Sequence, residues 1–221
     1  MNATTGQITG TPTQAGPYVV NVVVTDADGN QASNNYDIVV REPLVLTSTP
    51  LVDGTVGVAY LTQTILPATG GTTPYTYGAT NLPPGLSFNE TTREITGTPT
   101  QSGLFTTPVT VTDAEGRTAT INYAIRVQDP LSLPGQTLPD GNVNVLYPTQ
   151  TLPSASGGVG PYTYTATNLP NGLSFNQTTR QITGTPTQAG NYTITMTAKD
   201  ANDKTVSNNY ALRVIGTLNL P

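Results

Sequence analysis

Acidic side chains recur two residues apart, as Asp26 with Asp28 and as Asp113 with Glu115. Paired carboxylate oxygens near the end of a domain are what a hard cation such as calcium requires. The candidate metal ligands are Asp26, Asp28, Asp113, Glu115 and Asp200, with Asp53 and Asp140 as additional candidates. Calcium is therefore the one cofactor that the residue pattern suggests.

The last copy of this acidic pattern favours a structural role instead. Asp200 is followed by Asn202, and the acidic residue present earlier as Glu42 and Asp129 becomes Gly216. Because aspartate accepts hydrogen bonds from nearby backbone amides, we expect the first acid of each pair to cap a hairpin turn. An exposed turn also provides no desolvation to separate two carboxyl pKa values, so acid–base catalysis is disfavoured.

Asn-x-Thr sequences recur as well. Three start at equivalent points, at Asn2, Asn89 and Asn176, and a fourth starts at Asn191. This sequence is the acceptor for N-glycosylation in secreted proteins. Asparagine is also a favoured residue of tight turns, and a plain Asx turn is the favoured interpretation of the recurring three.

Composition removes most classes of enzyme, because the 221 residues include no His, Cys or Trp. An imidazole base, a thiolate nucleophile, a Cys/His zinc site and a Ser-His-Asp triad are therefore excluded. The 8 basic residues are scattered singly among 13 acidic ones, so we expect no nucleic-acid partner. No apolar run approaches the ~20 residues that a membrane-spanning helix needs.

The sequence is a tandem array. The heptapeptide Ile-Thr-Gly-Thr-Pro-Thr-Gln starts at Ile8, Ile95 and Ile182, which gives a period of 87 residues. Residues 43–127 align with 130–214 without a gap and agree at 50 of 85 positions, so both copies require one fold. We expect the second half of a repeat at 1–42, complete repeats at 43–129 and 130–216, and the first strand of another repeat at 217–221.

Alternation of apolar and polar residues predicts the strands. Tyr18, Val20 and Val22 share one face, and after a turn Tyr36 and Ile38 begin a second alternating run, which together predict a hairpin. Shorter apolar runs predict strands at 44–46, 56–60 and 75–79. About seven short strands per repeat predict an all-β chain of Greek-key sandwiches, each with two packed sheets.

The same pattern predicts the core. Equivalent buried pairs are expected at Phe88/Phe175, Ile95/Ile182, Val111/Ala198 and Tyr123/Tyr210. The eleven tyrosines could stack on sugars, but most occupy core-facing positions, so packing is the favoured explanation. Tyr75 with Tyr77, and Tyr162 with Tyr164, share a face and are expected to be buried.

A set of motifs in each repeat is characteristic of a family. It comprises Asn81-Leu82-Pro83-Pro84-Gly85-Leu86-Ser87-Phe88-Asn89, Ile95-Thr96-Gly97-Thr98-Pro99, Gly103 and Val111-Thr112-Asp113. The set recurs almost unchanged at 168–200, and its last part recurs at 8–26. It resembles the He-PIG repeats, prokaryotic Ig-like modules related to cadherin-like surface modules. The resemblance implies Ig-like sandwiches in arrays on extracellular adhesins, fibres and secreted hydrolases, with no fixed ligand and no catalytic residue.

From the repeat and the resemblance we expect a structural, non-enzymatic segment of an extracellular or cell-surface stalk, fibre or adhesin. Short linkers with proline at 41–43 and 128–130 predict a semi-rigid rod whose partners are adjacent repeats or other copies, head to tail. One alternative is an adhesive module that binds a glycan or surface protein through loops such as 68–74 and 155–161, which differ between copies. The other is an accessory segment of a secreted hydrolase.

Residues 1–42 carry only the later strands of a sandwich, so the apolar face of their hairpin is expected to need covering strands. Two routes provide them. Either the polypeptide continues in a longer array, or neighbouring molecules complete the fold by strand addition and build filaments.

Overall fold

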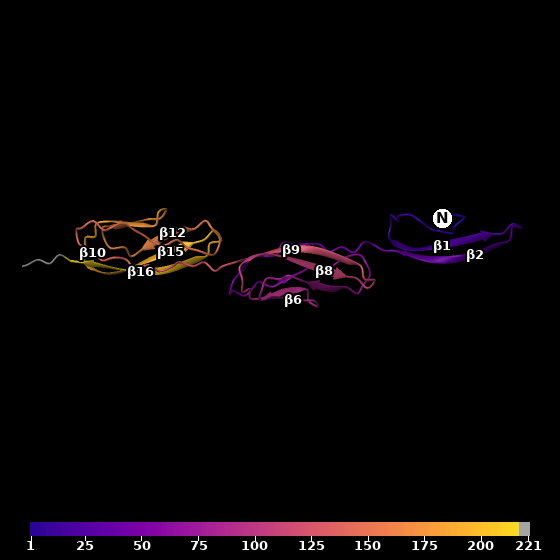
Figure 1. The fold of residues 1–221 in the computed structure, drawn as a ribbon, viewed down its shortest axis with the longest axis horizontal. Helices are drawn as coiled ribbons and strands as arrows, with labels where there is room; N and C mark the ends of the chain where they lie inside the picture. The colour runs from indigo at the N-terminus through magenta and orange to yellow at the C-terminus, as the bar shows by residue number, and fades with distance from the viewer. Residues whose placement is uncertain (217–221) are drawn as a thin grey trace, which may run out of the picture.

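The computed structural model describes residues 1–216, so the strand expected at 217–221 lies outside the described residues. All regular secondary structure in the described range is β-strand. Figure 1 shows the strands in three groups that follow one another along the long axis of the molecule. The described residues include no helix that could cross a membrane. The strands are β1 (Gly16–Thr25), β2 (Gln31–Val40), β3 (Gly54–Thr55), β4 (Gln63–Thr64), β5 (Thr76–Ala79), β6 (Leu86–Asn89), β7 (Glu94–Gly97), β8 (Gly103–Thr112), β9 (Thr118–Gln128), β10 (Gly141–Asn142), β11 (Gln150–Thr151), β12 (Thr163–Thr167), β13 (Leu173–Asn176), β14 (Gln181–Gly184), β15 (Gly190–Lys199) and β16 (Thr205–Ile215).

Strands β3 to β9 form two sheets, with orders β3-β9-β8-β5 and β4-β7-β6. β3 pairs in parallel with β9, whereas the other neighbours are antiparallel. The chain changes sheet between β3 and β4 and again before β5, β6 and β8, which is the Greek-key arrangement of an Ig-like sandwich. β10 to β16 repeat it, with orders β10-β16-β15-β12 and β11-β14-β13. The predicted all-β, tandem Ig-like fold is confirmed.

The long hairpin of each sandwich supplies one wall of the core. Val109 and Val111 on β8 are fully buried, and Ile125 on β9 is fully buried beside them. The residues between them face outward, where the Thr110 and Thr120 hydroxyl oxygens lie 2.8 Å apart across the two strands. This alternation follows from the two-residue period of a strand, so sequence pattern alone assigns the faces.

Most predicted core positions are confirmed. Ile95, Ile182, Val111, Ala198 and Tyr210 are fully buried, and Tyr123 is nearly so. Phe88 and Phe175 are only partly buried and pack against the margin of the core, because β6 and β13 are the edge strands of their sheets. Tyr77 and Tyr164 are buried, while Tyr75 and Tyr162 are partly buried beside them.

The geometry of the turn before β6 explains why the motif that begins at Asn81 recurs almost unchanged at Asn168. Asn81 has a φ of 55°, and its side-chain amide donates to the Thr106 carbonyl over 2.7 Å. Gly85 has a φ of 90°, and its carbonyl accepts from the Thr98 amide at 3.0 Å. A side chain at Gly85 would place its Cβ 2.0 Å from the Thr98 oxygen, so only glycine fits there.

The predicted strand at 56–60 is wrong. β3 ends at Thr55, and the chain turns so that the Val58 amide donates to the Thr55 carbonyl at 3.1 Å. Tyr60 is buried, and its amide bonds to the Gly97 carbonyl at 2.8 Å outside any ladder, while Val58 is exposed. The apolar spacing that looked like a strand therefore combines one core residue with a turn residue that faces solvent.

The predicted strand at 44–46 is also overestimated. It is reduced to a single antiparallel bridge between Val45 and Thr69, and its equivalent joins Ser132 to Ser156. Leu46 and Leu133 nevertheless reach the core as expected, at 7% and 6% exposure.

The first hairpin, β1 with β2, has the register of β8 with β9, since Gly16 faces Val40 as Gly103 faces Val127. It forms a two-stranded sheet of its own. Tyr36 is 51% exposed here, whereas the equivalent Tyr123 is 4% exposed. The face that forms the core of the sandwiches is thus open to solvent in residues 1–42.

Candidate functional site

The acidic turn at the end of β8 is a closed hydrogen-bonded cap. Asp113 Oδ1 accepts from the backbone amides of Glu115 at 3.0 Å and Arg117 at 2.9 Å. Asp113 Oδ2 accepts from the Thr72 amide at 3.0 Å, and the Arg117 guanidinium donates to it from Nε at 2.8 Å and from Nη2 at 2.7 Å. Five donors therefore converge on one carboxylate, which ties the hairpin turn to the loop before β5.

These contacts set the charge of Asp113. Burial of the carboxyl group favours its neutral form, but the hydrogen bonds from Arg117, Thr72 and Glu115 outweigh burial and lower the pKa of Asp113 to about 2. The side chain is buried, yet it remains ionised at neutral pH because its charge is paired and hydrogen-bonded.

The two other copies of the turn keep the cap without the arginine contact. In the first hairpin, the Asn30 side chain donates to Asp26 Oδ2 at 2.9 Å, and this bond is the main cause of a lowered pKa of Asp26. In the third, Asp200 accepts from the backbone amides of Val159, Asn202 and Lys204. Burial of Asp200 opposes ionisation, but these hydrogen bonds lower its pKa.

The additional candidate calcium ligands, Asp53 and Asp140, are close to other side chains of the protein. Asp53 accepts a hydrogen bond from Gln128 at 3.1 Å, and Asp140 lies 3.9 Å from Arg213. In residues 1–216 no three acidic side chains gather in an arrangement that could hold a metal ion. The geometry brings Asp113 and Glu115 together through Arg117, and calcium binding stays an untested hypothesis.

The recurring Asn-x-Thr sequences form Asx turns. Asn89 Oδ1 accepts from the Thr91 amide at 2.9 Å and from the Thr92 amide at 3.0 Å. Asn2 and Asn176 make the same pair of bonds at the start of their turns. Asn191 instead lies on β15 and is exposed. The favoured Asx turns are thus present at the three recurring asparagines, and glycosylation of any of the four stays an untested alternative.

The hairpin turns of the two full sandwiches also contact the preceding unit, which the sequence did not reveal. Glu115 Oε1 forms an ion pair with Arg41 Nε at 3.0 Å, across the junction that follows β2. Glu115 Oε2 lies 3.1 Å from Arg117 Nη2. At the next junction, Lys204 Nζ lies 3.4 Å from the Thr55 hydroxyl. The available signal was that Arg41 lies in a linker and that Glu115, Arg117 and Lys204 lie in hairpin turns, none of them at a core-facing position.

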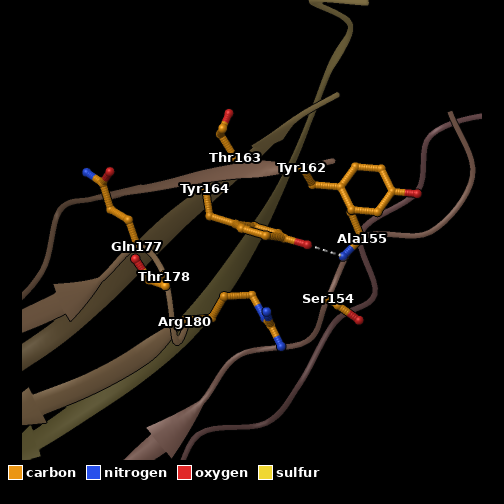
Figure 2. Close-up of a pocket in the computed structure, with 8 residues that line it drawn as sticks. All are labelled: Ser154, Ala155, Tyr162, Thr163, Tyr164, Gln177, Thr178 and Arg180. Carbon is orange, nitrogen blue, oxygen red and sulfur yellow. Dashed lines mark hydrogen bonds between the residues drawn. The ribbon is translucent and has the colours of Figure 1, made fainter. Parts of the chain in front are cut away.

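A cleft of about 560 Å³ opens beside β12 in the second sandwich. Six of the residues that line it are Ser154, Tyr162, Tyr164, Gln177, Thr178 and Arg180. Figure 2 shows the Tyr164 ring crossing the middle of the cleft, with its hydroxyl oxygen accepting from the Ala155 amide, a bond of 3.0 Å. Arg180 lies on one side of that ring, and its guanidinium end extends toward the segment that carries Ser154.

The arginine of this cleft has an unusual backbone conformation. Arg180 has a φ of 58°, and the equivalent Arg93 has a φ of 62°. Non-glycine residues rarely adopt this region, and its cost is offset here by side-chain contacts. Arg180 Nε donates to the Leu152 carbonyl at 3.2 Å, and its guanidinium carbon lies 5.3 Å from the centre of the Tyr164 ring. Sequence analysis missed this residue, although an arginine at the same place in both repeats was a signal.

The strand order, the capped hairpins and the duplicated motifs define the protein as a tandem array of Ig-like sandwiches. The family described as "Putative Ig domain" (He_PIG) matches residues 1–41, 42–128 and 131–215. The chain therefore belongs to this family.

Two similar curated proteins are both named "Serine-rich adhesin for platelets" and come from Staphylococcus aureus strains MSSA476 and MRSA252. Each is 30% identical over 196 residues, or 88% of this chain. The chain spans 8% of the length of the former and 14% of the latter.

Solved cadherin structures also align with the chain. Extracellular domains 1–4 of Protocadherin Gamma B7 are 12% identical, with a TM-score of 0.47, over 92% of this chain and 66% of that one. Domains EC22–24 of mouse Cadherin-23 are 15% identical, with a TM-score of 0.42, over 91% of this chain and 74% of that one. The fold assignment rests on the strand order and the family match.

Proposed function

We propose that this chain is a non-enzymatic spacer of an extracellular, cell-surface protein, in which Ig-like repeats hold an adhesive or anchoring part at a distance. The observation that carries the proposal is that the hairpin turn of each full sandwich contacts the preceding unit, as Glu115 does with Arg41 and Lys204 with Thr55. Such contacts restrict the angle between successive units. The named adhesin relatives support a surface location.

The repeat units of this spacer are residues 43–129 and 130–216, with 1–42 as the later part of a further unit. Each full unit contains its own pair of sheets and its own core cluster. Because the cores are separate, each unit resists unfolding by itself, and force on the chain passes along the linkers from one core to the next.

A second candidate function is ligand binding by the repeats themselves, through a glycan or a surface protein. The cleft beside Tyr164 favours it, because aromatic, hydroxyl, amide and guanidinium groups converge there on one exposed side of a sandwich.

Stretching single molecules of the full chain tests the spacer function. We expect two separate unfolding events, one for each full unit, each lengthening the chain by about 3.5 Å per residue released. Proline or aspartate placed in one core, as in Ile125→Asp, should remove one event and leave the other, because the cores are independent. Unfolding in one step, or loss of both events in the variant, would contradict the proposal.

A further inference from the structure

The cleft beside Tyr164 contains a guanidinium group that the protein holds in place but does not neutralise. Arg180 Nε donates to the Leu152 carbonyl at 3.2 Å, and the guanidinium carbon lies over the Tyr164 ring, 5.3 Å from its centre. Within residues 1–216, the terminal nitrogens of Arg180 form no ion pair and no hydrogen bond with a side chain or carbonyl. A fixed planar fork of this kind is suited to bidentate binding of a carboxylate.

The surrounding residues make the cleft favourable to an anion. Arg180 is the one charged residue among those that line it in the described part of the chain. The first sandwich has the equivalent arginine, Arg93, 5.5 Å from the centre of the Tyr77 ring. There, however, acidic residues flank the arginine, because Glu90 and Glu94 occupy the positions of Gln177 and Gln181.

The difference in charge between the two sites is two units. The turn with Arg93 carries two acids and one base, a formal charge of −1, whereas the turn with Arg180 carries one base and no acid, a charge of +1. Ser154 in the second sandwich also replaces Pro67, which adds a hydroxyl group to the wall of the cleft. Both copies keep the contact between arginine and tyrosine, and in the described residues neither arginine forms an ion pair, but only the turn of the second copy carries no acidic residue.

We propose that this cleft is a binding site for a sugar that carries a carboxylate, with Arg180 holding the carboxylate. Ser154, Thr178 and Gln177 also line the cleft, and their hydroxyl and amide groups can exchange hydrogen bonds with sugar hydroxyls. The volume of about 560 Å³ lies within the ordinary range for small-ligand sites. This inference rests on the second candidate function and is independent of the spacer function.

The first experiment is a titration of the full chain, labelled with ¹⁵N, by sodium glucuronate, followed through backbone amide chemical shifts. Shifts are expected at Tyr164, Thr178 and Arg180, with none at the equivalent Tyr77, Thr91 and Arg93. Glucose lacks the carboxylate, and sodium acetate lacks the hydroxyl groups, so each should bind at least about tenfold more weakly.

The second experiment exchanges the two sites by using residues that the fold already accepts. The variant Ser154→Pro/Gln177→Glu/Gln181→Glu gives the second sandwich the side chains of the first, and glucuronate binding should weaken about tenfold because a bound carboxylate then faces acidic groups. The reciprocal variant Pro67→Ser/Glu90→Gln/Glu94→Gln should produce glucuronate-dependent shifts at Arg93.

Three results would overturn the site. The first is the absence of localised shifts with glucuronate, and the second is unchanged affinity in the exchanged variant. The third is equal binding of acetate or of an aspartate-rich peptide, which would show that the cleft accepts any carboxylate and does not recognise a sugar. The stretching experiment does not depend on any of these results, so the spacer function is judged separately.

Discussion

At the residue scale, equivalent tyrosines in the two sandwiches differ in what their hydroxyl groups can reach. Tyr210 donates to the Pro134 carbonyl at 2.7 Å, and Asn208 fixes the same segment by donating to the Leu133 carbonyl at 2.9 Å. Tyr123 is buried as well, but among the described residues its hydroxyl has no hydrogen-bond partner. Isoleucine replaces Asn208 at position 121, so this second tie is missing from the first sandwich.

This difference predicts opposite effects for the same substitution. Tyr210→Phe should lower the free energy of unfolding by about 1 kcal/mol, because it removes a hydrogen bond and leaves a carbonyl unpaired. Tyr123→Phe should leave it unchanged or raise it by up to about 1 kcal/mol, because it removes a buried polar group that has no partner. Urea unfolding of both variants measures the difference. Equal destabilisation by the two substitutions would contradict the assignment.

The pKa of Asp113 predicts how acid acts on the first sandwich. Its folded pKa of about 2 lies below the ordinary value of 3.8, so the ionised carboxylate stabilises the fold above pH 3.8. That contribution is lost as the pH falls from 3.8 toward 2, while Asp113 becomes protonated. Melting temperatures of Asp113→Asn should therefore be lower at neutral pH and fall less steeply through this window. The control is Glu90→Gln, which removes a carboxylate outside this cap and which the second sandwich already contains as Gln177.

At the element scale, sequence pattern predicted the long strands and the short strand β5, and it failed on the runs at 44–46 and 56–60. β8 and β9 each carry ten or more residues of unbroken alternation, which only a strand with one buried face satisfies. The run at 56–60 has apolar residues at only three alternating positions, too few to distinguish a strand from a turn in which Tyr60 is buried and Val58 is exposed. The capped turns were predicted because aspartate at a hairpin has few other roles. The cleft was not, since Arg180 and Tyr164 are brought together only by the packing of two sheets.

Substitutions at two nearby glycines test which of these positions requires glycine. Gly85→Ala should destabilise the first sandwich by about 2 kcal/mol or more, because the backbone has a positive φ and the new Cβ would meet the Thr98 oxygen at 2.0 Å. Gly78→Thr on β5 should be neutral or stabilising, because a Cβ there meets no atom within 4 Å and the second sandwich carries Thr165 at that position. Chemical denaturation compares the two, and a tolerated Gly85→Ala would show that the turn is adaptable.

At the scale of the whole molecule, the turns that could have served as cation sites are occupied by the protein's own groups. Calcium at Asp113 would have to displace the Arg117 guanidinium, which lies 2.7 Å from Oδ2. We therefore expect thermal melts with added calcium and with a chelator to coincide. A fall of tens of degrees on chelation would instead show that ions hold the units together, as a cadherin-like array would require. Magnesium in place of calcium provides the control for general ionic strength.

The last prediction concerns the joints between units. An ion pair between exposed groups joins Arg41 to Glu115 at the first junction, whereas the equivalents at the second are Gln128 and Asn202, which cannot form one. We expect the range of angles between the two units to be narrower at the first joint than at the second at low salt. The two ranges should become similar near about 1 M salt, where exposed ion pairs are screened.

The chain contains no cysteine, so introduced cysteines can carry spin labels without competing sites. Equivalent exposed positions, Ser33, Thr120 and Ser207, give one pair of labels across each junction. Electron–electron distance distributions should be narrower for the Ser33/Thr120 pair, and Arg41→Gln should broaden that distribution until it matches the Thr120/Ser207 pair. If Arg41→Gln leaves the first distribution unchanged at low salt, the ion pair does not set the angle, and the stiffness of the rod must come from the proline-containing linkers.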